Sequence, residues 1–424
     1  MPLLGCIADD LTGATDIAGM LAQAGIQTEV VVDESAAWRR SNADAIVVAL
    51  KTRTADVKTA VEKSKHAADA LLGAGCRQIY FKYCSTFDST AQGNIGPVAD
   101  MLMDRLSATI AVVCPAFPAN ARTVYKGHLF VGDTLLSESS MRDHPLTPMR
   151  DSSLIRLLQP QTSRKVGLAT LQQVRSGAGN LKKRLTELGE ECGYGVVDAL
   201  ADEDLRIIGE VCLDMPLVTG GSGLASELAR NYLTAGLIQP SKAPRARFKA
   251  HGHQAVVAGS CSAMTLQQIR QMQGACPVYQ IDARELAIGE DVVTKSLSWS
   301  GLHLQNGPVL IYSSAEPTRL SRIQAELGAQ RVGALIESAL AKIIVGLVEQ
   351  GVGQLIVAGG ETSGAAVAAL GVSRLRVGAE IDPGVPWMEA KFANTAGRAP
   401  LHLALKSGNF GTKDFFLKAW SKLS

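Results

Sequence analysis

The stretch LLGCIADDLTGATDIAGML, residues 3–21, holds an apolar run, a polar turn and a helix-forming segment in that order. The run Leu3–Ala8 has the length and composition of a buried β-strand. Asp9, Asp10, Thr12 and Gly13 follow it at once, and small and apolar residues then continue toward residue 21. A strand joined by a short turn to a helix is the unit from which parallel sheets are built, so this stretch predicts an α/β fold.

The same alternation recurs along the rest of the chain, where short β-branched or aliphatic runs are separated by longer segments rich in Ala and Leu. The predicted strands are Leu3–Ala8, Ala45–Leu50, Gln78–Lys82, Ile110–Cys114, Gly195–Val197, Leu217–Val218, Ala255–Ala258, Val309–Tyr312, Gln354–Ala358 and Leu401–Lys406. The clearest predicted helix is Val332–Val348, whose apolar residues keep the spacing of one buried face. That face could pack on its own sheet or on a second subunit, because periodicity does not distinguish the two.

The chain has 424 residues, which predicts two or three compact units at roughly 150 residues per domain. The stretch from Gln239 to His253 contains two prolines, several basic residues and almost no apolar periodicity, as is typical of an exposed connection. We therefore expect two domains with a boundary near residue 245. The N-terminal domain would cover residues 1–240, a linker residues 241–254 and the C-terminal domain residues 255–424.

The composition is that of a globular protein, with 46% hydrophobic and 19% charged residues. The net charge of +2 lacks the basic excess of proteins that bind nucleic acid. There is no apolar stretch of about 18 residues and no basic leader before an apolar run, so we expect a cytoplasmic protein that binds neither nucleic acid nor membrane. The eight cysteines include no C-x-x-C pair, which predicts neither a disulfide framework nor a zinc site.

Five predicted junctions between strand and helix are rich in Gly, Ser and Thr: Ala8–Thr15, Thr219–Ser226, Gly259–Thr265, Ala358–Gly364 and Lys406–Thr412. Small residues let a ligand approach the backbone, and the N–H groups that open the next helix attract phosphate, although glycine is also common there for steric reasons alone. Three of the five lie in the C-terminal domain, where they predict a nucleotide site at the ends of the strands. Neither a P-loop nor a complete G-x-G-x-x-G fingerprint is present.

Polar side chains at the predicted strand ends are more numerous in the N-terminal domain. Asp9 and Asp10 are each a candidate either to accept a hydroxyl proton or to cap the following helix. The segment from Lys82 to Asn94 combines a cation, a carboxylate and several hydroxyl groups, which exceeds the needs of a turn. The alternative for this segment is a capped loop leading into a helix at Ile95–Leu102.

Basic residues follow two further predicted strands. Lys51 and Arg53 follow one of them, and Arg122 and Lys126 follow the other. Isolated basic residues are usually solvated, but several at one sheet edge suit an anionic substrate such as a small carboxylate.

In these motifs the chain resembles the four-carbon acid sugar kinases, long described as a domain of unknown function. The matching segments run nearly from end to end: Ala8-Asp-Asp-Leu-Thr-Gly-Ala14, Phe81-Lys-Tyr-Cys-Ser-Thr-Phe-Asp-Ser-Thr90, Gly93-Asn-Ile-Gly96, Gly259-Ser-Cys-Ser262, Gly359-Gly-Glu-Thr-Ser363, Pro383-Gly-Val-Pro-Trp387 and Leu405-Lys-Ser-Gly-Asn-Phe-Gly411. Leu11 replaces the Phe usual in the first motif, which is a hydrophobic exchange. Ala91 and Gln92 replace the Leu-Arg typical of threonate and erythronate kinases, and this departure favours the oxo-tetronate branch.

The resemblance implies an N-terminal domain that binds an acid sugar and a C-terminal domain that binds ATP, each a mostly parallel sheet flanked by helices, with the active site in the cleft between them. By resemblance, the residues that hold ATP would be Ser260, Ser262, Gly359, Gly360, Glu361, Thr362, Ser363, Gly408 and Asn409. Glu361 could also act through water on Mg²⁺, an ion that usually keeps several waters. The ligands of the metal itself stay open.

For the acid sugar, the same resemblance implies Asp10 or Asp9 as the base or as a ligand on the Mg²⁺ side. The substrate-binding candidates are Thr12, Lys51, Arg53, Lys82, Ser85, Asp88, Ser89, Asn94 and Arg122. Among them, Lys82, Arg53 and Arg122 would bind the carboxylate, whereas Asp88, Ser89 and Asn94 would bind hydroxyl groups.

The expected activity is ATP-dependent phosphorylation of the 4-hydroxyl of a 3-oxo-tetronate in acid-sugar catabolism. The alternatives are a D-threonate or D-erythronate 4-kinase of the same family and a non-catalytic acid-sugar sensor. A nicotinamide-dependent dehydrogenase is less favoured, because the dinucleotide fingerprint is missing. A homodimer is an open expectation.

Overall fold

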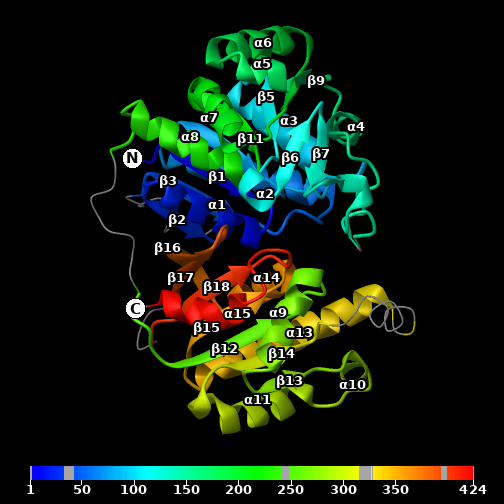
Figure 1. The fold of residues 1–424 in the computed structure, drawn as a ribbon, viewed down its shortest axis with the longest axis vertical. Coiled ribbons are helices and arrows are strands. Elements are labelled where there is room, and N and C mark those ends of the chain that lie inside the picture. Colours follow the sequence, from blue (N-terminus) through cyan, green and yellow to red (C-terminus); the bar gives the residue numbers. More distant parts are fainter. Residues whose placement is uncertain are drawn as a thin grey trace. The chain divides into compact units, whose positions relative to one another are not determined.

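The computed structural model describes residues 2–32, 43–144, 146–239, 248–314, 326, 328–392 and 399–423. The chain divides into two compact units, Met1–Lys242 and Ala243–Ser424 (Figure 1). Residues 240–247, which include the start of the predicted linker, lie outside the described residues. The later part of that linker belongs to the second unit, because Phe248 is buried in its core and a strand begins at His253.

In the described part of the first unit, the sheet has eight strands in the order β2-β3-β1-β4-β11-β5-β10-β9, and all neighbours are parallel. The strands are β1 (Leu4–Ala8), β2 (Thr28–Val31), β3 (Ala45–Ala49), β4 (Gln78–Lys82), β5 (Ala111–Cys114), β9 (Val166–Ala169), β10 (Tyr194–Val197) and β11 (Leu217–Gly220). The helices are α1 (Leu11–Gln23), α2 (Val57–Gly73), α3 (Ile95–Leu106), α4 (Leu154–Leu158), α5 (Leu171–Arg175), α6 (Ala178–Glu191), α7 (Asp202–Val211) and α8 (Ser222–Thr234). Every residue of β1, β3 and β4 is buried, as expected for a parallel sheet covered on both faces.

The register of this sheet aligns the carboxyl ends of its central strands. Ala8 of β1 pairs with Ala49 of β3 and with Lys82 of β4, and Gly220 of β11 pairs with Lys82 and with Cys114 of β5. The turns that follow these strands therefore meet at one edge, which is where open α/β sheets bind ligands.

A small antiparallel sheet, which the strand-and-helix pattern did not predict, joins this edge. It comprises β6 (Arg122–Tyr125), β7 (His128–Val131) and β8 (Thr134–Leu135). The Asp198 carboxylate, fully buried after β10, accepts hydrogen bonds from the backbone N–H groups of Lys126 and Gly127 at 2.8 Å and of Leu171 at 3.0 Å. This carboxylate fixes the turn between β6 and β7, and with it the strand that carries Arg122.

The sheet of the second unit is mixed, in the order β13-β14-β12-β15-β18-β17-β16. The neighbouring strands β13, β14, β12, β15 and β18 are parallel to one another, whereas β17 is antiparallel to both β18 and β16. The strands are β12 (His253–Ala258), β13 (Val278–Gln280), β14 (Val309–Tyr312), β15 (Val352–Ala358), β16 (Val372–Asp382), β17 (Val385–Phe392) and β18 (His402–Lys406). The helices are α9 (Ala263–Gln273), α10 (Ala283–Ala287), α11 (Val292–His303), α13 (Ala329–Glu349), α14 (Gly360–Leu370) and α15 (Phe415–Lys418).

The predicted α/β class is confirmed, and the long helix predicted at Val332–Val348 is α13. Its apolar face is buried within its own unit, since Leu340, Ile343, Ile344 and Leu347 have no exposed surface and the helix contacts α11, α14 and β15. Of the two predicted alternatives, its own sheet or a second subunit, the face is therefore covered by its own unit. In the described part of the chain, no helix has the length and apolarity needed to cross a membrane.

Candidate active site

The turn between β1 and α1 places Asp9 and Asp10 at the edge where the central strands end. Asp10 is the N-cap of α1, in extended backbone conformation. Its Oδ1 accepts from the Gly13 N–H at 2.8 Å and its Oδ2 accepts from the Thr12 hydroxyl at 2.6 Å. Capping was one of the two roles predicted for this pair, and it accounts for the position of Thr12.

Arg53, in the loop after β3, joins the two carboxylates. Its Nε donates to Asp9 Oδ2 at 3.0 Å and its Nη2 donates to Asp9 Oδ1 at 2.7 Å, while the same Nη2 lies 2.8 Å from Asp10 Oδ1. Asp88 Oδ2 is 3.8 Å from Nη1. One guanidinium is therefore surrounded by three carboxylates, and this excess of negative charge raises the pKa of Arg53 although burial opposes it.

The two neighbouring carboxyl groups differ in their acidity. Burial raises the pKa of Asp9, and the attraction of Arg53 offsets this only in part. Burial acts in the same direction on Asp10, but Arg53 and the Thr12 hydroxyl outweigh it and lower the pKa. Asp9 is therefore the stronger base but has both oxygens on Arg53, whereas Asp10 is the more exposed of the two, with 17% of its side chain accessible against 4%.

Lys82 brings a second cation to the same turn. Its side chain is buried, and its Nζ donates to the Tyr83 carbonyl at 2.9 Å and lies 3.8 Å from Asp16 Oδ2, which also accepts from the Ser222 hydroxyl at 2.6 Å. A Cβ on Gly13 would overlap Asp10 Oδ1 and would lie 3.3 Å from Lys82 Nζ and 3.6 Å from Arg53 Nη2. Glycine at this position therefore makes room for the Asp10 carboxylate beside both cations.

The loop after β4 is held in an unusual backbone conformation. Phe87 and Asp88 have left-handed φ angles of 66° and 43°, which is uncommon for residues other than glycine and is frequent at functional sites. The Asp88 carboxylate accepts from the Thr86 hydroxyl at 2.7 Å. The Ser89 hydroxyl donates to Oε1 of Gln161 at 3.1 Å, and the same oxygen accepts from the N–H of Gly96.

Asn94 connects this loop to the one that carries Arg53. Its amide donates to the carbonyl of Thr52 at 2.6 Å and to that of Ala55 at 3.1 Å. It directly precedes α3 but makes no side-chain capping bond there, so the capped-loop alternative does not account for it. Asn94 instead fixes the backbone on both sides of Arg53.

The other substrate candidates of this unit differ in exposure. Ser85 is buried and Lys51 is exposed. Arg122, on β6, is partly buried; burial lowers its pKa, and one of its terminal nitrogens donates to the carbonyl of Asn120. Within the described residues its Nε has no hydrogen-bond partner and no carboxylate lies at ion-pair distance from it. Arg122 therefore has donors to offer an anion.

One of the five glycine-rich junctions is explained by packing alone. At Thr219–Ser226, a Cβ on Gly220 would overlap the carbonyl oxygen of Cys114, and on Gly221 it would lie 2.7 Å from that of Pro115. These glycines face carbonyl oxygens, which repel anions. The steric alternative therefore accounts for this junction.

In the second unit, three predicted turns do come together. Ala258 of β12 pairs with Ala358 of β15, which pairs with Lys406 of β18, so the turns after these strands start side by side. A Cβ on Gly408 would overlap the Ser260 hydroxyl and would lie 2.9 Å from that of Ser262.

The other members of the predicted nucleotide set lie around the same turns. A Cβ on Gly259 would overlap the Thr362 hydroxyl, and Gly359, with a φ of 127°, lies against Ser260. Ser262 caps α9, Glu361 is exposed in the first turn of α14, and Asn409 is exposed. Gly360 is the first residue of α14, whereas the Ser363 side chain is completely buried.

Several side chains that build these turns were not singled out from the sequence. In the first unit they are Asp16, Gln161 and Ser222, and in the second Thr265, Gln268, Asp382 and Lys406. The visible signal was Lys406, a lysine at the end of an apolar strand. The others are common polar residues whose partners lie far away in the sequence.

Magnesium ligands are not evident as a cluster. Among the described residues, no group of three or more His, Cys, Asp or Glu side chains could hold a metal ion. A site in which one carboxylate and the phosphates of a nucleotide share Mg²⁺ with water needs no such group, and the exposed Glu361 beside the nucleotide turns fits it.

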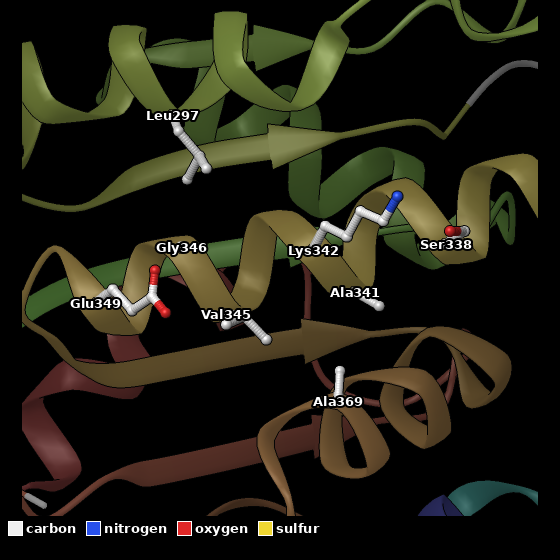
Figure 2. Close-up of a pocket in the computed structure, with 8 residues that line it drawn as sticks. All are labelled: Leu297, Ser338, Ala341, Lys342, Val345, Gly346, Glu349 and Ala369. Atoms are coloured by element: carbon white, nitrogen blue, oxygen red, sulfur yellow. The ribbon is translucent and has the colours of Figure 1, made fainter.

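A separate hollow of about 370 Å³ lies on the second unit where α11, α13 and α14 meet (Figure 2). Its lining includes Leu297 of α11, Val345 and Gly346 of α13, and Ala369 of α14. None of the predicted site residues lines it.

Family models match both units. A model described as a sugar-binding N-terminal domain matches residues 4–228, and one described as a nucleotide-binding C-terminal domain matches residues 255–416. Curated relatives named 3-oxo-tetronate kinase match the whole chain. The protein of Burkholderia multivorans is 48% identical over 99% of this chain and 96% of its own length, and that of Salmonella typhimurium is 41% identical over 98% of each.

Two solved structures are similar over the full length. A Salmonella typhimurium LT2 protein, described as a tRNA synthase candidate, has a TM-score of 0.85 and 40% identity over 100% of both chains. A Haemophilus influenzae protein, assigned to a domain of unknown function, has a TM-score of 0.75 and 40% identity over 99% of this chain and 100% of its own.

Proposed function

The chain belongs to the four-carbon acid sugar kinase family, and we propose that it transfers the terminal phosphoryl group of ATP to the 4-hydroxyl of 3-oxo-tetronate. The observation that carries this proposal is full-length identity of 41–48% to proteins named 3-oxo-tetronate kinase. The replacement of Leu-Arg by Ala91 and Gln92 supports the same branch of the family.

The nucleotide half-site of this proposal is in the second unit. Ser260, Ser262 and Thr362 place hydroxyl groups beside the buried Gly359 and the partly exposed Gly408, and the absence of a side chain leaves the backbone of Gly408 accessible. The start of α14 adds N–H groups suited to phosphate. Bound Mg²⁺ would neutralise charge on the transferred group, and Glu361 would hold it through water.

The sugar-acid half-site is in the first unit. Arg122, with its unused Nε, and Lys82 are our candidates for the substrate carboxylate, and Ser89 and Asp88 for hydroxyl groups. Arg53 holds Asp9 and Asp10 in place, and the more exposed Asp10 would accept the proton of the attacking hydroxyl. Phosphoryl transfer asks for little more than this positioning and charge neutralisation. A reaction cleft between the two units and a homodimer remain predictions.

A coupled assay of ADP release with ATP and Mg²⁺ tests the proposal. The acceptors are D-threonate, D-erythronate, L-threonate and 3-oxo-tetronate generated in situ by a dehydrogenase. We expect turnover with the oxidised acid alone. Turnover with a reduced acid would keep the kinase and overturn its branch. If the protein binds ATP but turns over none of these acceptors, the proposed class of acceptor is wrong and the sensor alternative is favoured. A role on tRNA is not supported, because the net charge of +2 lacks the basic excess of proteins that bind nucleic acid.

A further inference from the structure

Lys406, the last residue of β18, is a lysine without exposed surface. Its Nζ donates to the carbonyl oxygens of Gly408 at 2.8 Å, Ser407 at 2.9 Å and Phe410 at 3.1 Å, and it lies 3.3 Å from the Thr265 hydroxyl. All four partners are uncharged. Among the described residues, no carboxylate lies within ion-pair distance of this ammonium.

The loop that begins at Lys406 is also held from α9. The Thr265 hydroxyl donates to the Gly408 carbonyl at 2.9 Å. The Gln268 amide donates to the carbonyls of Phe410 at 3.1 Å and Thr412 at 2.9 Å. The carbonyl groups of this loop thus point toward Lys406 and α9.

The backbone N–H groups of Gly408 and Asn409 have no acceptor within the part of the chain that the structure describes. Successive N–H groups left free by such a turn form a concave site for anions. Ser260 and Ser262, whose hydroxyl groups lie against Gly408, border it.

A buried cation without a countercharge is unfavourable compared with an apolar side chain of the same size, so packing alone does not call for lysine here. What lysine supplies is three N–H donors at one point. A methionine in its place would fill the same volume but would remove one of the two donors of each of the three carbonyl oxygens, which keep only Thr265, Gln268 and the Phe410 N–H.

We propose that Lys406 is the residue that positions the nucleotide loop: by gathering the carbonyls of Ser407, Gly408 and Phe410, it presents the N–H groups of Gly408 and Asn409 to a phosphate of ATP. The proposal rests on the proposed ATP site. Because its side chain is completely buried, Lys406 acts through the loop and does not touch the nucleotide.

The test compares the full-length chain with Lys406→Met and with Lys342→Met, which makes the same exchange at an exposed position of α13 in the same unit. Calorimetry measures the Kd of a non-hydrolysable ATP analogue, and steady-state kinetics measure KM for ATP and for the acid sugar. We expect Lys406→Met to weaken the analogue at least tenfold and to raise KM for ATP by a similar factor. KM for the acid sugar should stay within twofold, and Lys342→Met should match the wild type.

If Lys406→Met does not fold, Thr265→Val removes the hydroxyl that supports Gly408 while keeping Lys406, and it should weaken the analogue three- to tenfold. An unchanged Kd in a folded Lys406→Met variant, or in Thr265→Val, would overturn the role of Lys406 while leaving the kinase intact. A general loss in which both KM values rise together would also overturn it, because a merely structural role predicts that result. Failure of the wild type to bind the analogue would overturn the proposed ATP site and this inference with it.

Discussion

Asp10 has a local structural role beside the catalytic role that we propose for it. As the N-cap of α1 it satisfies the N–H of Gly13, and this bond sets the direction of its carboxylate. Burial would raise the pKa of this carboxylate, but Arg53, the Thr12 hydroxyl, Lys82 and the Gly13 N–H together lower it and so favour the ionised form. The cap therefore does not exclude the base role that we propose, because the remaining lone pairs of its oxygens can still face substrate.

Replacing Asp10 with Asn tests this role. Asn caps a helix about as well as Asp, so we expect the variant to fold, whereas it cannot accept the proton and should lose 10²- to 10⁴-fold in kcat. Asp56→Asn is the matched control. Asp56 also caps a helix, since it accepts from the N–H of Thr59 at the start of α2 at 2.9 Å, but it is not one of the carboxylates that bind Arg53. Its kcat should equal that of the wild type. Circular dichroism checks folding, and full turnover by a folded Asp10→Asn variant would exclude Asp10 as the base.

The lowered pKa of Lys406 predicts the direction in which the free energy of unfolding changes with pH. Burial lowers its pKa to about 7 from 10.5, so between these values the unfolded chain binds more protons than the folded one. Stability from this residue must therefore rise with pH, by about 2 kcal/mol between pH 7 and pH 9. Urea unfolding of wild type and Lys406→Met at both pH values measures it. Three of the four tryptophans, Trp299, Trp387 and Trp420, lie in the second unit and report its unfolding.

Groups common to both proteins cancel in this comparison. Equal pH slopes for wild type and variant would mean that Lys406 keeps an ordinary pKa. The ATP affinity should move in the opposite direction, because deprotonation removes one of the three N–H donors that gather the loop carbonyls.

At the scale of elements, the sequence predicts the strands and helices whose apolar pattern is unbroken. The strands β1 and β3 are apolar throughout because both faces of a parallel sheet are covered, and each predicted strand is present with its ends shifted by at most a few residues. The hairpin of β16 and β17 was not predicted. Its first strand alternates apolar residues with Arg374, Arg376 and Glu380, and irregular pairing interrupts its periodicity. The strands β6 and β7 are each only four residues long, which is too short for an alternation of apolar and polar residues to be recognised.

The turns were predictable in position but not in purpose. A glycine at a strand end indicates that another group lies close to the backbone, but the sequence does not show which group. In the structure it is a carbonyl oxygen at Gly220 and a hydroxyl group of the predicted nucleotide site at Gly408. Gln161 and Gln268 were missed for a related reason. Each acts on a loop distant in sequence, so no local spacing marks it.

The turn after β18 provides an element-scale prediction. In Gly408→Ala, the new methyl group would displace the Ser260 hydroxyl, so we expect KM for ATP to rise roughly 10- to 100-fold, as for a lost hydrogen bond to a charged group. Gly333→Ala is the control: it lies exposed on α13 with no atom within 4 Å of an added Cβ. That change should leave KM for ATP unchanged and raise stability by about 0.5–1 kcal/mol. Equal KM values in both variants would remove Gly408 from the nucleotide site.

At the scale of the whole molecule, the chain keeps its two kinds of chemistry in separate compact units. The first unit holds carboxylates, cations and hydroxyl groups suited to a small acid, and the second holds glycine turns suited to phosphate. Among the described residues, the hydrogen bonds cited for each proposed half-site join residues of the same unit. Substitutions in one unit should therefore change affinity for one ligand only.

Arg122 tests this separation. With a partly buried guanidinium whose Nε has no partner among the described residues, Arg122→Gln should lose a charge-assisted bond to the substrate carboxylate, about 1.5–3 kcal/mol or 10- to 100-fold in KM for the acid sugar. KM for ATP should stay within twofold. Arg105→Gln, which breaks an exposed ion pair with Asp69 in the same unit, should change neither constant. If Arg122→Gln raised KM for ATP instead, Arg122 would belong to the phosphate, and the assignment of one ligand to each unit would be wrong.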